Sequence, residues 1–262
     1  MLKNELYYFF AALGFYTRIP CPRWAKFSSE ILNKSLKYFP IIGLIIGCIA
    51  AGSVWLLDLL FPLSISILLS MMLTVYVTGA FHEDGFTDSC DAFGGGWTKE
   101  QVLTIMKDSR IGAYGTVGII LLLMLKLLAL YEIGLMSMPI LMISYLNAHI
   151  ASRFMAVLVI QNHDYVQDID KSKSKPIAAK KLSISEISYS SLCVLLASAL
   201  FYPNLIFLIA FPIIYLTQWY LGQFFKRRIG GYTGDALGAT QQITEVMFYL
   251  SILVSLELTS LA

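Results

Sequence analysis

The chain has 262 residues, of which 57% are hydrophobic and 14% charged, and its formal net charge is +2. A soluble domain carries about a quarter charged residues, so this composition excludes an ordinary soluble fold and indicates a surface that meets lipid. The small net charge gives no reason to expect nucleic acid as a partner, and the four cysteines show neither a CxxC pair nor zinc-ligand spacing.

An apolar run over residues 6–15 opens the chain and leads into Arg18 without a cleavage site, which predicts an interfacial or re-entrant segment. About 20 apolar residues cross the hydrocarbon core of a bilayer. Such stretches follow near 38–60, 62–81, 113–135, 139–161, 186–202, 204–222 and 243–261. The sequence therefore predicts an all-α, polytopic integral membrane helical bundle with about seven spans, forming one domain over residues 1–262.

The Lys and Arg residues are distributed unevenly around these spans. Of the 19, 17 precede the first span or lie in the long segments 82–112, 162–185 and 223–242, and the turns near 61, 137 and 203 contain none. The positive-inside rule predicts a cytoplasmic N-terminus, three cytoplasmic loops and an external C-terminus, in a bacterial inner membrane. We expect the five lysines of 162–185 to anchor this orientation rather than to act in catalysis.

The densest polar segment follows the second predicted span. Asp84, Asp88 and Asp91 are spaced i, i+4, i+7, so on a helix they share one face and repel one another. A divalent cation offsets this repulsion, and oxygen ligands favour Mg²⁺, Mn²⁺ or Ca²⁺ over zinc. We therefore predict a Mg²⁺ site formed by these aspartates, with Glu83 as an additional ligand. The alternative is a solvated acidic loop.

Two further segments carry groups that suit phosphate. Gly94 and Gly95 can present backbone N–H groups to a phosphate, although a flexible turn is the simple alternative. Lys107 and Arg110 can neutralise phosphate oxygens, or they can serve only as positive-inside anchors. The intervening polar residues, Asp108 and Ser109, favour a binding site, because an anchor needs only cations.

The last long segment adds Asp235, Gln242 and Glu245, which can share one helical face. A carboxylate such as Glu245 is costly near lipid unless it meets a partner, and we expect Arg153 to pair with it or with substrate. His82 and His149 are either bases or packing residues. Carboxylates for a metal and cations for phosphate, all predicted at one membrane face, indicate phosphoryl transfer.

At these residues the chain resembles the cobalamin synthase (adenosylcobinamide-GDP ribazoletransferase) family. The shared motifs are F-x-T-R-I-P at 15–20, F-P-x-x-G at 39–43, H-x-D-G-x-x-D-x-x-D at 82–91, K-D-S-R-I-G at 107–112 and G-D-x-x-G-A-x-x-Q-x-x-E at 234–245. Combined with the residue-level argument, the resemblance predicts a catalytic set of Asp84, Asp88, Asp91 and Arg110. The predicted substrate-binding set is Arg18, Gly94, Gly95, Lys107, Asp108, Ser109, Asp235, Gln242 and Glu245.

The resemblance implies a Mg²⁺-dependent reaction in which α-ribazole, or its 5′-phosphate, attacks the phosphorus of adenosylcobinamide-GDP that bears the corrinoid arm. GMP leaves, and adenosylcobalamin or its 5′-phosphate forms. A homo-oligomer, or association with other enzymes of nucleotide-loop assembly, is a further expectation. Two alternatives remain: a CDP-alcohol phosphotransferase, although Thr87-Asp88 stands where that family has Ala-Arg, and a cation-coupled transporter, whose acids would lie near mid-membrane.

Overall fold

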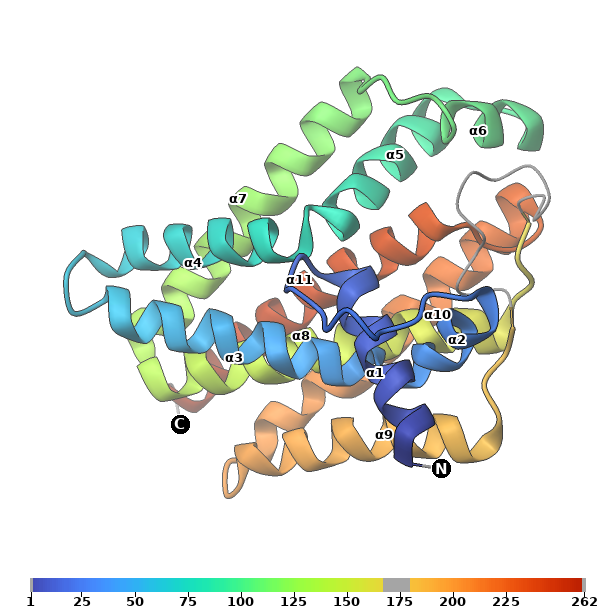
Figure 1. Cartoon of the computed structure of the whole chain (residues 1–262). Helices are drawn as coiled ribbons and strands as arrows, with labels where there is room; N and C mark the ends of the chain where they lie inside the picture. Colours follow the sequence, from blue (N-terminus) through green and yellow to red (C-terminus); the bar gives the residue numbers. More distant parts are fainter. Residues whose placement is uncertain (1, 167–179, 261–262) are drawn as a thin grey trace.

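The computed structural model describes residues 2–166 and 180–260, and this part of the chain is built of helices without a β-sheet (Figure 1). The α-helices are α1 (Leu2–Tyr16), α2 (Ser29–Ser35), α3 (Phe39–Leu57), α4 (Leu63–Thr78), α5 (Phe81–Gly95), α6 (Lys99–Ile105), α7 (Ala113–Met136), α8 (Met138–Asn162), α9 (Ile184–Ser198), α10 (Ala210–Ile229) and α11 (Gly234–Ser260). Three 3-10 turns join them: η1 (Leu36–Tyr38), η2 (Ala199–Phe201) and η3 (Leu205–Ile209).

In the described residues, six helical segments are long and apolar enough to cross a membrane, and the bent pair α4–α5 brings the number to seven. The predicted helical membrane bundle is therefore confirmed. The pair bends by 89° at Gly79 and Ala80, both of which have positive φ. With 16 residues, α4 rises only about 24 Å, somewhat less than the hydrocarbon core. The first helix, α1, has 15 residues and is not among the candidate spans of the described residues, and its interfacial or re-entrant position stays a prediction.

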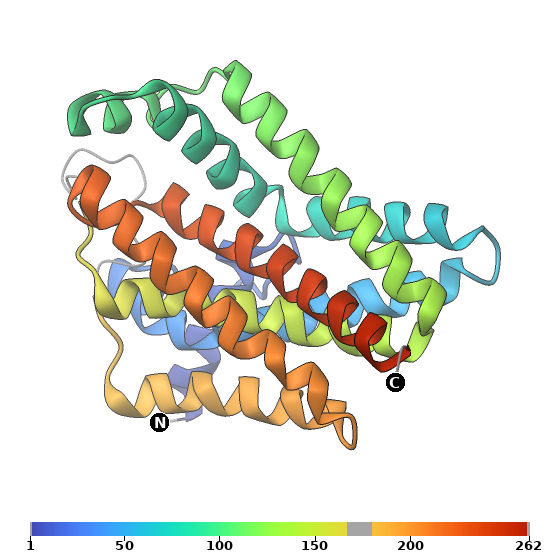
Figure 2. The same ribbon diagram turned by 180° about the vertical axis from the view of Figure 1, so that it is seen from behind.

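The two ends of the bundle differ. The short turns α3–α4, α7–α8 and α9–α10 lie at the end that holds the C-terminus, whereas α6 and the α10–α11 turn lie at the other end (Figures 1 and 2). The basic residues of segments 82–112 and 223–242 thus gather at one end. Lys171, Lys173 and Lys175, which belong to the predicted anchoring loop, lie outside the described residues.

The predicted loop 223–242 is mostly helix, which corrects the predicted boundaries. The first of its helices, α10, continues to Ile229 and ends at Gly230, whose φ of 90° suits glycine. Three residues later Thr233 accepts the N–H of Ala236 at 3.2 Å, so α11 already begins at Gly234. Only residues 230–233 form the turn. The polar stretch that precedes the last predicted span is therefore the first part of that span.

Glycines allow the central helices to approach closely, as small residues do in membrane bundles. On α3, a Cβ added to Gly43 would overlap the backbone oxygen of His149 on α8. On α5, a Cβ at Gly85 would lie 3.0 Å from the backbone oxygen of Asp235, and one at Gly238 would lie 3.2 Å from Gly85 Cα. The contact between α5 and α11 brings two polar segments, far apart in the sequence, side by side.

Candidate active site

A cluster of carboxylates lies where α5 meets the beginning of α11. Asp84 is exposed and Asp88 half-buried on α5, and the half-buried Asp235 of α11 is close enough to interact electrostatically with both. The helical spacing predicted for the aspartates is confirmed, because all three lie within α5. The structure adds that Asp235 comes from a second helix to join Asp84 and Asp88, through the close approach at Gly85.

Asp91 has a different environment from Asp84. Its buried carboxylate accepts the N–H of Gly112 at 2.7 Å and that of Gly115 at 2.8 Å. A side chain at either glycine would collide with this carboxylate. Asp91 therefore caps the N-terminus of α7, where the helix dipole favours a negative charge. Asp91 thus has partners on α7 that Asp84 lacks, although it remains close enough to Asp88 to interact with it electrostatically. The convergence of all three aspartates on one metal, and a ligand role for Asp91, stay predictions.

The glycines at the end of α5 also differ from expectation. Gly94 and Gly95 belong to the last helical turn, and the N–H of Gly96 is donated to Ala92, so these amides are not presented to a phosphate as predicted. The helix end instead exposes carbonyls, and Arg228 donates to that of Gly96 at 2.7 Å. Gly94 leaves room for the ring of Tyr114, which would be 2.6 Å from a Cβ. Their role in substrate binding stays a prediction.

The loop that precedes α7 carries the predicted phosphate-binding cations. Arg110 is 86% exposed and binds Asp108 side-on, with Nε 3.0 Å from Oδ1 and Nη2 2.6 Å from Oδ2. These hydrogen bonds lower the pKa of Asp108 to about 2. Lys107 and Ser109 are exposed beside the pair. The loop enters α7 at the helix end that Asp91 caps. The hydrogen bonds from the α7 amides to Asp91 therefore hold Lys107 and Arg110 next to α5.

Arg18 lies at the bend between α4 and α5. Its backbone N–H is donated to Val77 at 2.7 Å, and its guanidinium lies 5.6 Å from the centre of the Tyr76 ring. The side chain is exposed there. A substrate-binding role for Arg18 stays a prediction, and the structure shows that the residue contacts the kinked segment from which α5 starts.

A second polar cluster lies inside the bundle, on the other side of α5. Glu83 accepts a hydrogen bond from Gln242 at 2.9 Å and does not join Asp84. Further along α11, Glu245 forms an ion pair with Lys126 of α7, and both side chains are buried. The sequence predicts that Arg153 pairs with Glu245 or with substrate. The direct ion-pair partner of Glu245 is Lys126 instead, and contact of Arg153 with substrate stays a prediction.

Arg153 and the two histidines surround this ion pair. Arg153 donates to the carbonyl oxygen of His149 at 3.0 Å, and His149 Nδ1 lies 3.4 Å from Glu245. His82 is buried and stacks on Phe39. Lys126, which the structure places at the centre of this cluster, is not among the residues singled out from the sequence. The available signal was a single lysine within an apolar span, since such a charge requires an anion.

The donor set at the carboxylate cluster suits a hard cation. No group of three or more His, Cys, Asp or Glu side chains in the described residues is arranged to hold a metal by itself. Mg²⁺ rarely uses such a cage, because it keeps several waters and binds through one or two carboxylates plus substrate phosphates. Asp84, Asp88 and Asp235 provide oxygen ligands of this kind from two helices, and thus fit an ion completed by substrate.

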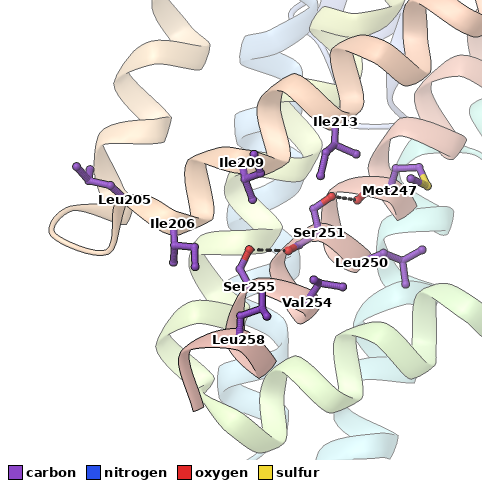
Figure 3. A pocket seen from close by; sticks show the side chains of 10 residues that line it. All are labelled: Leu205, Ile206, Ile209, Ile213, Met247, Leu250, Ser251, Val254, Ser255 and Leu258. Carbon is purple, nitrogen blue, oxygen red and sulfur yellow. Dashed lines mark hydrogen bonds between the residues drawn. The ribbon is translucent and has the colours of Figure 1, made fainter. Parts of the chain in front are cut away.

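An apolar groove at the far end of α11 is a separate feature (Figure 3). Its lining consists of Leu205, Ile206, Ile209, Ile213, Met247, Leu250, Ser251, Val254, Ser255 and Leu258. The two serines donate to backbone carbonyls of their own helix. With no ionisable side chain in its lining, the groove has no group that would bind a phosphate or a metal.

Comparison with known proteins gives a consistent result. The profile of the family described as cobalamin-5-phosphate synthase matches residues 8–253. The adenosylcobinamide-GDP ribazoletransferase of Shewanella frigidimarina is 48% identical over 255 residues, which cover 95% of each chain. Proteins of the same name from Shewanella woodyi and Shewanella oneidensis are 43% and 41% identical, over 97% and 96% of this chain and 98% and 95% of theirs. No solved structure matches the chain.

Proposed function

This chain belongs to the cobalamin-5-phosphate synthase family, and we propose that it is a Mg²⁺-dependent adenosylcobinamide-GDP ribazoletransferase. The acceptor, α-ribazole or its 5′-phosphate, attacks the phosphorus that carries the adenosylcobinamide arm. The bond from this phosphorus to the GMP leaving group breaks, and the product is adenosylcobalamin or its 5′-phosphate. The observation that carries the proposal is the family match over residues 8–253, together with the close approach of the two helices, α5 and α11, that bear the motifs 82–91 and 234–245.

In the proposed active site, aspartates bind the metal and basic residues bind the phosphates. Asp84, Asp88 and Asp235 would hold Mg²⁺ where α5 meets α11. When bound, the ion would supply positive charge to the transferring phosphoryl group and the departing GMP. Arg110 and Lys107 bind the remaining phosphate charge, and a guanidinium can contact two oxygens at once. Asp108 orients Arg110 through the side-on pair.

Asp91 acts indirectly in this scheme. By capping α7 it holds the 106–112 loop, with Arg110, next to the acidic helix. Asp91 is thus a positioning residue, and the metal is bound by aspartates that remain open to substrate.

The proposed location is the bacterial inner membrane, with a single membrane-embedded transferase domain whose active site faces the cytoplasm. The support is the gathering of basic residues at the end of the bundle that holds α6 and the α10–α11 turn.

The test uses the purified protein in nanodiscs with adenosylcobinamide-GDP, α-ribazole and Mg²⁺. We expect GMP and adenosylcobalamin in equal amounts, loss of turnover with EDTA, and recovery when Mg²⁺ is added back. Asp84→Asn is the matched negative variant, because this side chain is exposed and its change leaves the packing intact. Failure of the wild-type protein to form GMP would refute the proposed activity. Turnover that EDTA does not affect would refute the proposed Mg²⁺ dependence.

A further inference from the structure

Three helices of the site are joined in pairs by polar contacts. The first contact joins α5 to α7, where Asp91 accepts the backbone N–H groups of Gly112 and Gly115. The second joins α7 to α11, through the ion pair of Lys126 with Glu245. The third joins α11 back to α5, through the hydrogen bond from Gln242 to Glu83. The contacts form a closed triangle, which we call the α5–α7–α11 triangle.

The Lys126–Glu245 side of the triangle is deeply buried. The Lys126 side chain is 6% exposed and the Glu245 side chain 1%. Gln241 donates to Glu245 Oε2 at 2.6 Å, and the Tyr249 hydroxyl donates to Oε1 at 3.3 Å. A buried ion pair adds little net stability, since its attraction offsets a large desolvation cost. The pair nevertheless fixes the relative position of α7 and α11, because separating the two buried charges would leave each without a partner.

The Glu83–Gln242 hydrogen bond joins the same two helices, α5 and α11, that carry the carboxylate cluster. Glu83 precedes Asp84 in α5, so its side chain leaves the helix on a different face and points into the bundle. Gln242 lies about two turns after Asp235 in α11. A shift of one helix along the other would therefore move Asp84 and Asp88 relative to Asp235 by the same amount.

We propose that Glu83, Gln242, Lys126 and Glu245 are positioning residues, which set the spacing between the carboxylates of α5 and α11 without touching substrate or metal. The expected effect on metal binding rests on the proposed function, whereas the effect on the spacing of α5 and α11 can be measured without any turnover. It explains why Gln242 and Glu245 lie in the same motif as Asp235: the motif places one carboxylate at the site and two groups that hold its helix.

The first experiment measures the helix spacing without turnover. Spin labels replace the exposed Trp97 and Glu257 in a variant without native cysteines, and pulsed EPR gives the distance distribution. The pair Lys126→Met with Glu245→Met removes both members of the ion pair, so neither charge is left without the other. The pair Glu83→Met with Gln242→Met removes the acceptor and the donor of the hydrogen bond together. We expect both pairs to shift or broaden the distribution. The control Ser70→Ala removes a buried hydroxyl contact between α3 and α4 and should leave it unchanged.

The second experiment measures Mn²⁺ binding by EPR in nanodiscs with GMP present. We expect at least tenfold weaker binding in both Met pairs and binding within threefold of wild type in Glu83→Gln, which keeps an acceptor for Gln242. Unchanged distances in both Met pairs would overturn the inference. Equal losses in Glu83→Gln and in the pair Glu83→Met with Gln242→Met would make Glu83 a metal ligand and would also overturn the inference. If the wild-type protein binds no Mn²⁺, the metal of the proposed function is refuted, while the distances still decide the positioning role.

Discussion

The role of Asp91 provides the sharpest prediction, because sequence and structure assign it differently. The spacing with Asp84 and Asp88 predicts a metal ligand, whereas the structure shows a cap on α7. If Asp91 is a cap, the main effect of Asp91→Ala should be a lower free energy of unfolding, and any loss of turnover should follow from that destabilisation. Asp91→Asn should have a smaller effect, because an amide keeps one oxygen acceptor.

The magnitude follows from the two hydrogen bonds, at 2.7 and 2.8 Å, to a charged and buried acceptor. Hydrogen bonds to charged groups contribute about 1.5–3 kcal/mol each. Asp91→Ala should therefore lower the free energy of unfolding by about 4 kcal/mol, and Asp91→Asn by about 2 kcal/mol. For a chain of this size, 1 kcal/mol shifts Tm by about 2–4 °C, so Asp91→Ala should melt roughly 10 °C lower.

The assay is thermal unfolding in detergent without substrate, with Asp84→Asn as the matched control. Asp84 is an exposed aspartate on the same helix, so its loss should change the free energy of unfolding by less than about 0.5 kcal/mol. Gly115→Ala tests the same bond from α7, because the new methyl group would collide with the Asp91 carboxylate. A wild-type Tm in Asp91→Ala together with lost turnover would refute the cap and restore the ligand role.

Further predictions concern the other elements of the site. Asp84→Asn and Asp88→Asn should each reduce kcat by several orders of magnitude with normal folding, and near-normal turnover in either would contradict their metal role. Arg110→Lys should lower kcat/KM at least tenfold, about 1.4 kcal/mol, because lysine lacks the planar fork; unchanged kinetics would make Arg110 a simple anchor. The pKa of Asp108 is depressed to about 2, so its pairing persists above the unfolded value near 4 and is lost only as pH falls through 2. Carboxyl ¹³C NMR should show Asp108 still ionised at about pH 3.5, where an aspartate with the ordinary pKa is mostly protonated, and a titration midpoint of about 4 would contradict the pairing. Gly43→Ala should lower expression and Tm, because its methyl group would overlap the backbone of α8, and a wild-type Tm would show that the helices can separate there.

The sequence alone determined the class of protein and the family to which its motifs belong. Apolar stretches without a polar face predicted the membrane helices, since hydropathy and length are properties of each segment by itself. The spacing of Asp84 and Asp88 predicted their shared helix for the same reason, because helical periodicity is local. The order of the motifs predicted the family, and the comparison confirmed it.

The tertiary structure decided which side chains meet. Nothing local to Asp235 shows that it lies near Asp88 and Asp84, because that proximity depends on the close approach of α5 and α11 at Gly85. The same holds for Lys126, whose partner Glu245 lies on another helix. Asp91 has the right spacing for a ligand and a different partner, since its direction is set by the two amides of α7. Periodicity specifies the face of a helix that a residue occupies, whereas packing between distant segments specifies what that face contacts.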